Sequence, residues 1–246
     1  MISFPLRPNN SGRPNAVAEN AGSIYRQATI TYSEPYSLDS QTLTLSSFNL
    51  SQANFVDMQP VHGTIKKLLS MGDSMLILQE RKASMAPMSR NLIEYVNGGA
   101  GVTVSSEFIG PQSFYGGDYG INDNPESVIS VFGNTYFVDV RQGKVIRLSA
   151  NGIEPISEQG IDSFMTTKCS EVVSIGTGNF KIHGGYDPQH KEYLVTFEKY
   201  KGAGVFTNET IAYDTKSSVW NTRYSFIPES YAYMNNQMFY VQVCVI

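Results

Sequence analysis

The chain has 246 residues, of which 41% are hydrophobic and 16% charged, and its formal net charge is −4. Its densest cationic stretches are only the pairs Lys66-Lys67 and Arg81-Lys82, which argues against nucleic-acid binding, because that binding depends on cationic contacts to phosphate. No apolar run approaches the ~18 residues of a membrane-spanning helix, and the N-terminus lacks the charged start and apolar stretch of a signal peptide. We therefore expect a chain that is made in a cytoplasm and contacts neither nucleic acid nor membrane.

Residues 1–22 predict a flexible N-terminal arm, because they are rich in Asn, Pro, Gly and Ser and show no hydrophobic alternation. Residues 23–246 predict one β-rich domain, since Thr, Val and aromatic residues fill short runs between Gly, Asn, Asp and Pro clusters. The run 239–246 breaks off while still strand-like, and we expect this domain to be incomplete at its C-terminus.

The first part of this domain predicts several short strands. Residues 25–32 fit one strand, and Leu43 and Leu45 fit another. Residues 65–69 fit either a helical turn or a strand, and both interpretations stay open. Residues 75–78 form a short apolar run, which suits a buried strand.

Residues 128–156 give the clearest pattern, which predicts a four-stranded antiparallel meander. Apolar and polar residues alternate in short runs, and Gly-bearing turn signals separate the runs at nine-residue intervals. The expected turns are Gly133-Asn134, Arg141-Gln142-Gly143 and Asn151-Gly152.

A short helix and a second meander are expected next. Asp162 is a suitable cap for a helix over 163–170. The meander that follows contains alternating strands at about 193–198, 211–213 and 220–226, and residues 238–245 resemble a last strand.

A weak internal repeat links the two meanders. Val138-Asp139, Tyr186-Asp187 and Tyr213-Asp214 each begin seven residues before a large apolar residue, namely Val145, Tyr193 and Trp220. The shared unit is a strand, a turn in which Asp can bind backbone N–H groups, and a second strand. Repeated four-stranded units are typical of β-propeller blades. The predicted fold is therefore all-β and β-propeller-like, built of antiparallel meanders with one or two short helices; a sandwich or an irregular barrel is the alternative.

The chain shows no strong chemical motif. His183 and His190 are too few for a zinc site, and the oxygen-rich segment 118–126 fits Asx turns better than a calcium loop. Cys169 and Cys244 lie 75 residues apart without a metal-binding companion, so we expect free thiols. We expect no catalytic residue, cofactor or metal.

Aromatic side chains are the candidates for an interaction site, because Tyr and Trp are favoured anchors at protein interfaces. Each of them could equally belong to the core. The candidates are Tyr115, Tyr119, Tyr186, Tyr213 and Trp220.

Several segments, taken in order, resemble a known family. They include His62-Gly63-Thr64-Ile65, Leu76-Ile77-Leu78-Gln79-Glu80-Arg81-Lys82, Asn124-Pro125-Glu126-Ser127, Tyr136-Phe137-Val138-Asp139, Gly143-Lys144-Val145-Ile146-Arg147-Leu148-Ser149 and Phe226-Ile227-Pro228-Glu229. Between about residues 25 and 239 the chain is similar to the large tail proteins of crAss-like phages, the stabilisation or muzzle proteins. These proteins are typically far longer than this chain.

The resemblance implies a structural, non-catalytic component of a tailed-phage virion. The expected partners are other tail proteins and copies of the same chain, and the expected location is the virion. A glycan-binding propeller or a glycosidase-like tail module is the alternative function.

Overall fold

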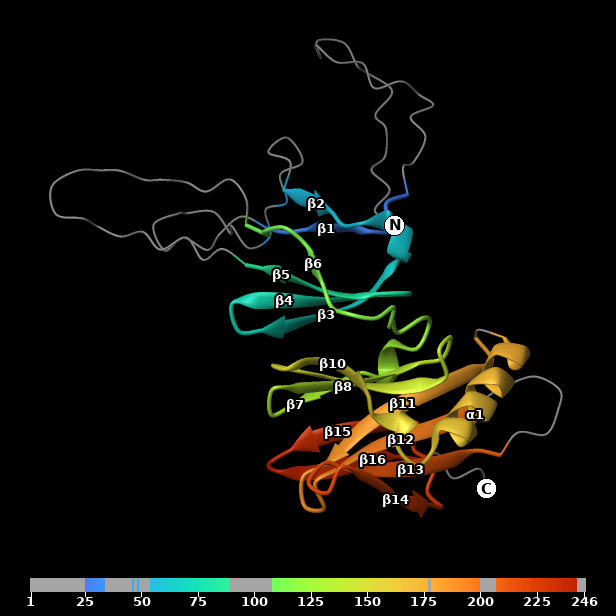
Figure 1. The fold of residues 1–246 in the computed structure, drawn as a ribbon. Helices are drawn as coiled ribbons and strands as arrows, with labels where there is room; N and C mark the ends of the chain where they lie inside the picture. The colour runs from blue at the N-terminus through green and yellow to red at the C-terminus, as the bar shows by residue number, and fades with distance from the viewer. Residues whose placement is uncertain are drawn as a thin grey trace, which may run out of the picture.

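The computed structural model describes residues 25–33, 46, 48, 54–88, 108–176, 178–199 and 207–242. Antiparallel sheets make up most of this part, together with one α-helix, so the predicted all-β class is confirmed (Figure 1). The expected arm at 1–22, the expected strand at Leu43 and Leu45, and residues 243–246 lie outside the described residues.

The first two sheets form one end of the molecule. Strands β1 (Thr29–Thr31) and β2 (Phe55–Asp57) form a hairpin-like pair. The next sheet has the order β3-β4-β5-β6, and its strands are β3 (Ile65–Met71), β4 (Ser74–Gln79), β5 (Ala83–Pro87) and β6 (Ser113–Phe114). Residues 65–69 are therefore a strand and not a helical turn.

The predicted meander at 128–156 is confirmed as a four-stranded sheet of order β10-β9-β8-β7. Its strands are β7 (Ile129–Val131), β8 (Asn134–Asp139), β9 (Lys144–Ser149) and β10 (Gly152–Pro155).

Two turns of this meander lie one residue earlier than expected. Val131 pairs with Asn134, so the first turn consists of Phe132 and Gly133, which both have the positive φ of a tight hairpin. Ser149 likewise pairs with Gly152, which makes Gly152 the first residue of its strand.

The second predicted meander is also confirmed, with the order β11-β12-β13-β14. Its strands are β11 (Phe180–Asp187), β12 (Glu192–Lys199), β13 (Glu209–Asp214) and β14 (Val219–Tyr224). A final hairpin follows, formed by β15 (Ser230–Met234) and β16 (Gln237–Val241). Strand β16 covers residues 238–241 of the strand expected at 238–245.

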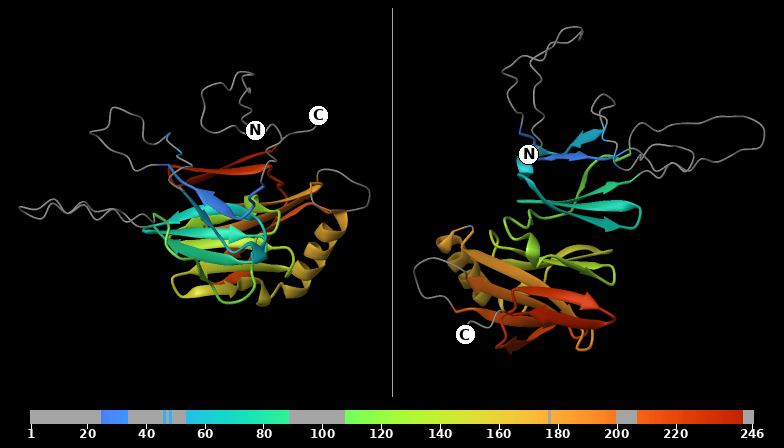
Figure 2. Two further views of the ribbon diagram at one scale, coloured as in Figure 1. Left: turned by 90° about the horizontal axis from the view of Figure 1, so that it is seen from above. Right: turned by 180° about the vertical axis from the view of Figure 1, so that it is seen from behind.

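The sheets are stacked face to face in chain order (Figures 1 and 2). In β4 the fully buried Leu76 and Leu78 face the sheet β7–β10, whereas Ile77 faces the β1–β2 pair. In β12 the fully buried Tyr193 and Phe197 face back toward the sheet β7–β10. Because a central strand is covered on both sides, it reads as a continuous apolar run, as at Leu76-Ile77-Leu78.

Helix α1 (Asp162–Ile175) packs against the core between the second and third four-stranded sheets. It is longer than the expected helix at 163–170, and its N-cap residue is Ile161 rather than Asp162, which lies in the first turn. Cys169 is a free, buried thiol, as expected, and burial raises the pKa of this thiol to about 12.

The internal repeat corresponds to one recurrent turn. Oδ1 of Asp139 accepts the backbone N–H of Gln142, and Oδ1 of Asp187 and of Asp214 accepts the N–H groups two and three residues further on. The fourth residue after each Asp has a positive φ; these residues are Gly143, Lys191 and Ser218. The three aspartates therefore have the structural role that the repeat predicted.

A short 3₁₀ turn, η4 (Pro125–Ser127), joins the three four-stranded sheets. Lys67 of β3 donates to the carbonyl oxygens of Pro125 and Val128, at 2.9 and 3.2 Å. The hydroxyl of Tyr193 on β12 donates to the carbonyl oxygen of Ser127 at 3.0 Å. A Cβ added at Gly184 of β11 would overlap that same carbonyl group, so only glycine permits this approach.

Replacing Gly184 with Ala should destabilise the protein by about 2–3 kcal/mol, because the new methyl group must displace the backbone of Ser127. Urea unfolding monitored by circular dichroism measures the change. Gly116→Ala is the control, since Gly116 has an ordinary φ and open space around its Cβ position. Equal unfolding midpoints for the two variants would show that η4 does not require this close contact.

Candidate functional site

The five aromatic residues expected at an interaction site lie in two separate groups. Tyr186, Tyr213 and Trp220 belong to the core between the second and third four-stranded sheets. Tyr115 and Tyr119 pack against the core between the first and second. The indole N–H of Trp220 donates to the carbonyl oxygen of Ile156 at 3.0 Å, and burial raises the pKa of Tyr115. None of the five is classed as exposed, and their role at an interface stays a prediction.

The carboxylates that were weighed as metal ligands or catalytic groups make structural contacts. In the segment 118–126, Asp118 binds Lys82 at 2.9 Å and Asp123 binds Lys66 at 2.6 Å. Burial raises the pKa of Asp139, and its carboxylate accepts the backbone N–H groups of Gly120 and Gln142. Over the ranges that the structure describes, no three His, Cys, Asp or Glu side chains gather in a way that could hold a metal ion.

An exposed apolar face on the β15–β16 hairpin is the feature best suited to an interaction. Side chains alternate between the two faces of a hairpin, and residues paired across the strands share a face. The outward face carries Met234, Phe239 and Val241, which are 61, 46 and 57% exposed, together with Ser230, Ala232 and Gln237. Three large apolar side chains on a face turned to water are unusual, because such faces are mostly polar.

The inward face of the hairpin is fixed to the third four-stranded sheet. The ring of Tyr231 occupies the space beside Gly185, where a Cβ would overlap it. Its hydroxyl lies 2.6 Å from Oγ1 of Thr196, which in turn lies 2.8 Å from Oγ1 of Thr210. Burial raises the pKa of Tyr231 to about 12, so the phenol stays a neutral hydrogen-bonding group. Tyr231 thus anchors the hairpin through its inward face, on which Tyr233 and Tyr240 are still 50 and 46% exposed, and the outward face is turned away from the third sheet.

The opposite end of the stack has a different character. There the outer face of β1–β2 carries an ion pair between Arg26 and Asp57 at 3.2 Å, and the Arg26 guanidinium lies 4.8 Å from the centre of the Phe55 ring. Thr31 donates from its hydroxyl to the carbonyl oxygen of Asn54. Among the described residues, the outer face of β1–β2 is therefore more polar than the outward face of β15–β16.

The sequence-based list of candidates missed Met234, Phe239 and Val241. The sequence of residues 230–241 did contain a signal for an exposed apolar face. Apolar residues occur at the positions of both faces of the hairpin, although the third sheet covers one of these faces.

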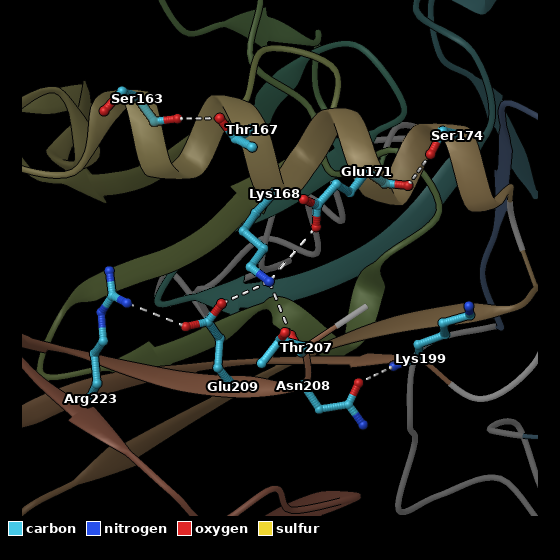
Figure 3. A network of polar contacts seen from close by, with 10 residues as sticks. All are labelled: Ser163, Thr167, Lys168, Glu171, Ser174, Lys199, Thr207, Asn208, Glu209 and Arg223. Carbon is cyan, nitrogen blue, oxygen red and sulfur yellow. Dashed lines mark hydrogen bonds and ion pairs between the residues drawn. The ribbon is translucent and has the colours of Figure 1, made fainter. Parts of the chain in front are cut away.

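A buried charge network holds helix α1 over the third four-stranded sheet (Figure 3). The Lys168 ammonium lies 2.7 Å from Oε1 of Glu209 and donates to the carbonyl oxygen of Thr207 at 3.0 Å. Glu171 and Arg223 extend the network at 3.7 Å from Lys168 and from Glu209. Because its donors and acceptors are matched, we interpret this network as a structural contact that holds the helix on the sheet, and not as a reactive site.

A second buried pair lies on the face of the third sheet that the hairpin covers. Nε2 of His183 lies 3.3 Å from Oε2 of Glu198, and their side chains are 6 and 12% exposed. Burial lowers the pKa of His183, although Glu198 opposes that shift.

Comparison with known proteins gives no further assignment, because no family model and no curated protein matches the chain. None of the helices in the described ranges is long and apolar enough to cross a membrane.

Replacing Lys168 with Met should destabilise the protein by about 2–3 kcal/mol, because Glu209 loses its close cation and, of its described ion-pair partners, keeps the more distant Arg223. The double variant K168M/E209M should lose less than the single variant, since no carboxylate then stays buried without its ammonium. Urea unfolding of the four members of this cycle gives the coupling energy.

Lys144→Met is the matched control, because the Lys144–Glu158 pair is more exposed than Lys168–Glu209 and should contribute less than about 1 kcal/mol. Additive losses at Lys168 and Glu209 would contradict the fastening role.

The buried pair predicts a dependence of stability on pH. The pKa of His183 is lower in the folded protein than its unfolded value of about 6.5. The unfolded chain therefore binds the proton more tightly, and the free energy of unfolding should fall as the pH drops below about 6.5.

His183→Gln should flatten this decline, measured by urea unfolding at intervals between pH 7.5 and 5. The exposed His190 has the opposite sign, because Asp187 raises its pKa. His190→Gln should therefore leave the decline in place or steepen it slightly. An unchanged slope in the His183 variant would contradict the assignment.

Proposed function

We propose that the chain is a structural, non-catalytic component of a tailed-phage virion that packs against neighbouring tail subunits and copies of itself. The outward apolar face of β15–β16 is the observation that carries this proposal. The segments that resemble crAss-like phage tail proteins, in the same order along the chain, suggest the virion tail as the assembly. The anchoring of the hairpin by Tyr231 supports a rigid contact surface.

The proposed architecture is a propeller-like arrangement of blades. Three consecutive four-stranded antiparallel units, each with its strands in sequential order, support this interpretation. The same aspartate turn in two of these units supports it as well. In this arrangement β15–β16 would supply part of a further blade, whose outer side a neighbouring subunit covers.

The proposed contact depends on burial of apolar surface. Met, Phe and Val side chains each contribute about 1.5–3 kcal/mol when they pass from full exposure to full burial. The side chains of Met234, Phe239 and Val241 are about half exposed. Burying the exposed half of each in a contact would therefore contribute a substantial part of this free energy. Such residues suit the core of an interface, which is depleted in charge.

The proposed virion location is tested by peptide mass spectrometry on purified particles of the source phage. Peptides of this chain should appear among the structural proteins in reproducible amounts. Their absence from well-covered particles would contradict the structural proposal.

The contact surface is tested by the double variant M234K/F239K in a phage whose own copy of the gene is deleted. Lysines on the outward face must remain solvated, so particle assembly and titre should fall sharply. The control V61K/V173K makes the same change at two residues that are 68 and 61% exposed on η3 and α1. Circular dichroism of the purified chains confirms folding. Equal titres for both variants would exclude this face as the contact.

A further inference from the structure

A groove of about 540 Å³ opens at the turn-bearing edge of the second and third four-stranded sheets. The turns after β7, β11, β13 and β15 gather around it, and its walls combine aromatic, amide and cationic side chains. No carboxylate lies among the described residues that line it. This composition differs from the apolar outward face of β15–β16 and points to a ligand rather than to sheet packing.

Arg147 supplies a cation at the base of the groove. It pairs with Tyr136 across β9 and β8, and one end of its guanidinium forms an ion pair with Glu154. Its Nε atom is buried and has no hydrogen-bond partner in the part of the chain that the structure describes. A buried donor without a partner costs free energy. The Arg147 side chain as a whole is 26% exposed and lines the groove, so its positive charge is available there.

Two lysines supply further positive charge at the rim. Lys191 and Lys216 come from the equivalent aspartate turns after β11 and β13. The aspartates of those turns are directed to other groups, because Asp187 binds backbone N–H groups and His190, and Asp214 binds backbone N–H groups and the Ser217 hydroxyl. The ammonium groups therefore remain suited to an external anion.

An aromatic ring stands at the same rim. Phe132 is 77% exposed, although it is a large apolar residue, and its ring meets that of Tyr186 edge to face at 5.8 Å. Its φ of 48° is uncommon for a bulky residue, so the tight turn holds the ring in this position. The exposed face of such a ring is suited to stack on the C–H surface of a sugar.

We infer that this groove binds an acidic oligosaccharide. Arg147, Lys191 and Lys216 would receive the carboxylates, Phe132 would stack on a sugar ring, and the amide of Asn134 would bind hydroxyl groups. The site is formed by turns, whereas the proposed subunit contact is the strand face of β15–β16, and the inference goes beyond the proposed structural role.

Two other anionic ligands fit less well. A nucleic acid would need a longer series of cations along its backbone than the three that line the groove. An acidic peptide strand would need a free sheet edge for main-chain pairing, whereas the groove is formed by turns.

The inference is tested with the complete chain by isothermal titration with tetragalacturonate, a uronic acid tetramer, and with maltotetraose as the neutral sugar. Saturable binding of tetragalacturonate alone is expected, with weaker affinity at higher salt. The variant K191Q/K216Q should bind roughly tenfold more weakly or worse. Phe132→Asn should also lose on the order of tenfold, because Asn accepts the positive φ but offers no ring.

Arg81→Gln is the matched control, because it removes an exposed positive charge from the β4–β5 turn, away from the groove, and should leave affinity unchanged. All variants are compared after thermal unfolding confirms that they are folded. Three results would overturn the inference: no saturable binding, equal binding of maltotetraose, or binding of a poly-Glu peptide or oligo-dT as tight as that of tetragalacturonate.

Discussion

The contact between η4 and the strands around it determines how the layers fit together. One short turn offers its carbonyl oxygens to Lys67 from one sheet and to Tyr193 from another, while its own Ser127 hydroxyl accepts the backbone N–H of Val138 at 3.3 Å. Buried carbonyl groups are costly when they lack partners, so these three sheets can close on one another only with the turn in place. The absence of a side chain at Gly184 then permits the approach of β11.

This close stacking explains the distribution of apolar and polar residues. Between the layers, tyrosines bring both ring area and a hydroxyl, as in the stacked pair Tyr136 and Tyr193, whose centres lie 4.9 Å apart. Buried charged groups have polar partners: Lys168 pairs with Glu209, and Asp139 accepts backbone N–H groups. Carboxylates at the turns serve the backbone. The described part of the chain thus uses most of its distinctive side chains to hold layers together and leaves two surfaces, the hairpin face and the groove, for other molecules.

The sequence predicted those strands and turns that depend on residues close together in the chain. The two meanders and the aspartate turns were visible because each rests on a short segment with alternation and a turn residue. The turn at Phe132 was misplaced by one residue, since Gly133 accepts a positive φ at either position of the turn. The role of η4 was not predictable, because Lys67 and Tyr193 lie 58 and 66 residues from the groups that they bind. The same holds for the candidate sites. The tyrosines singled out by type lie in or against the cores between the sheets, and their role at an interface stays a prediction. The outward position of Met234 and Phe239 depends on which face of the hairpin meets Gly185.

The contrast between the two ends of the stack restricts the symmetry of any association between copies. An apolar face is matched by another apolar face, whereas the described outer face of β1–β2 carries the Arg26–Asp57 ion pair. Head-to-tail addition, which would propagate into open fibres, would bury that ion pair against hydrocarbon. Two copies meeting through β15–β16 would instead be related by a twofold axis, and each would cover the apolar hairpin face of the other. Contact between copies of the chain through this face would therefore be self-limiting at a pair.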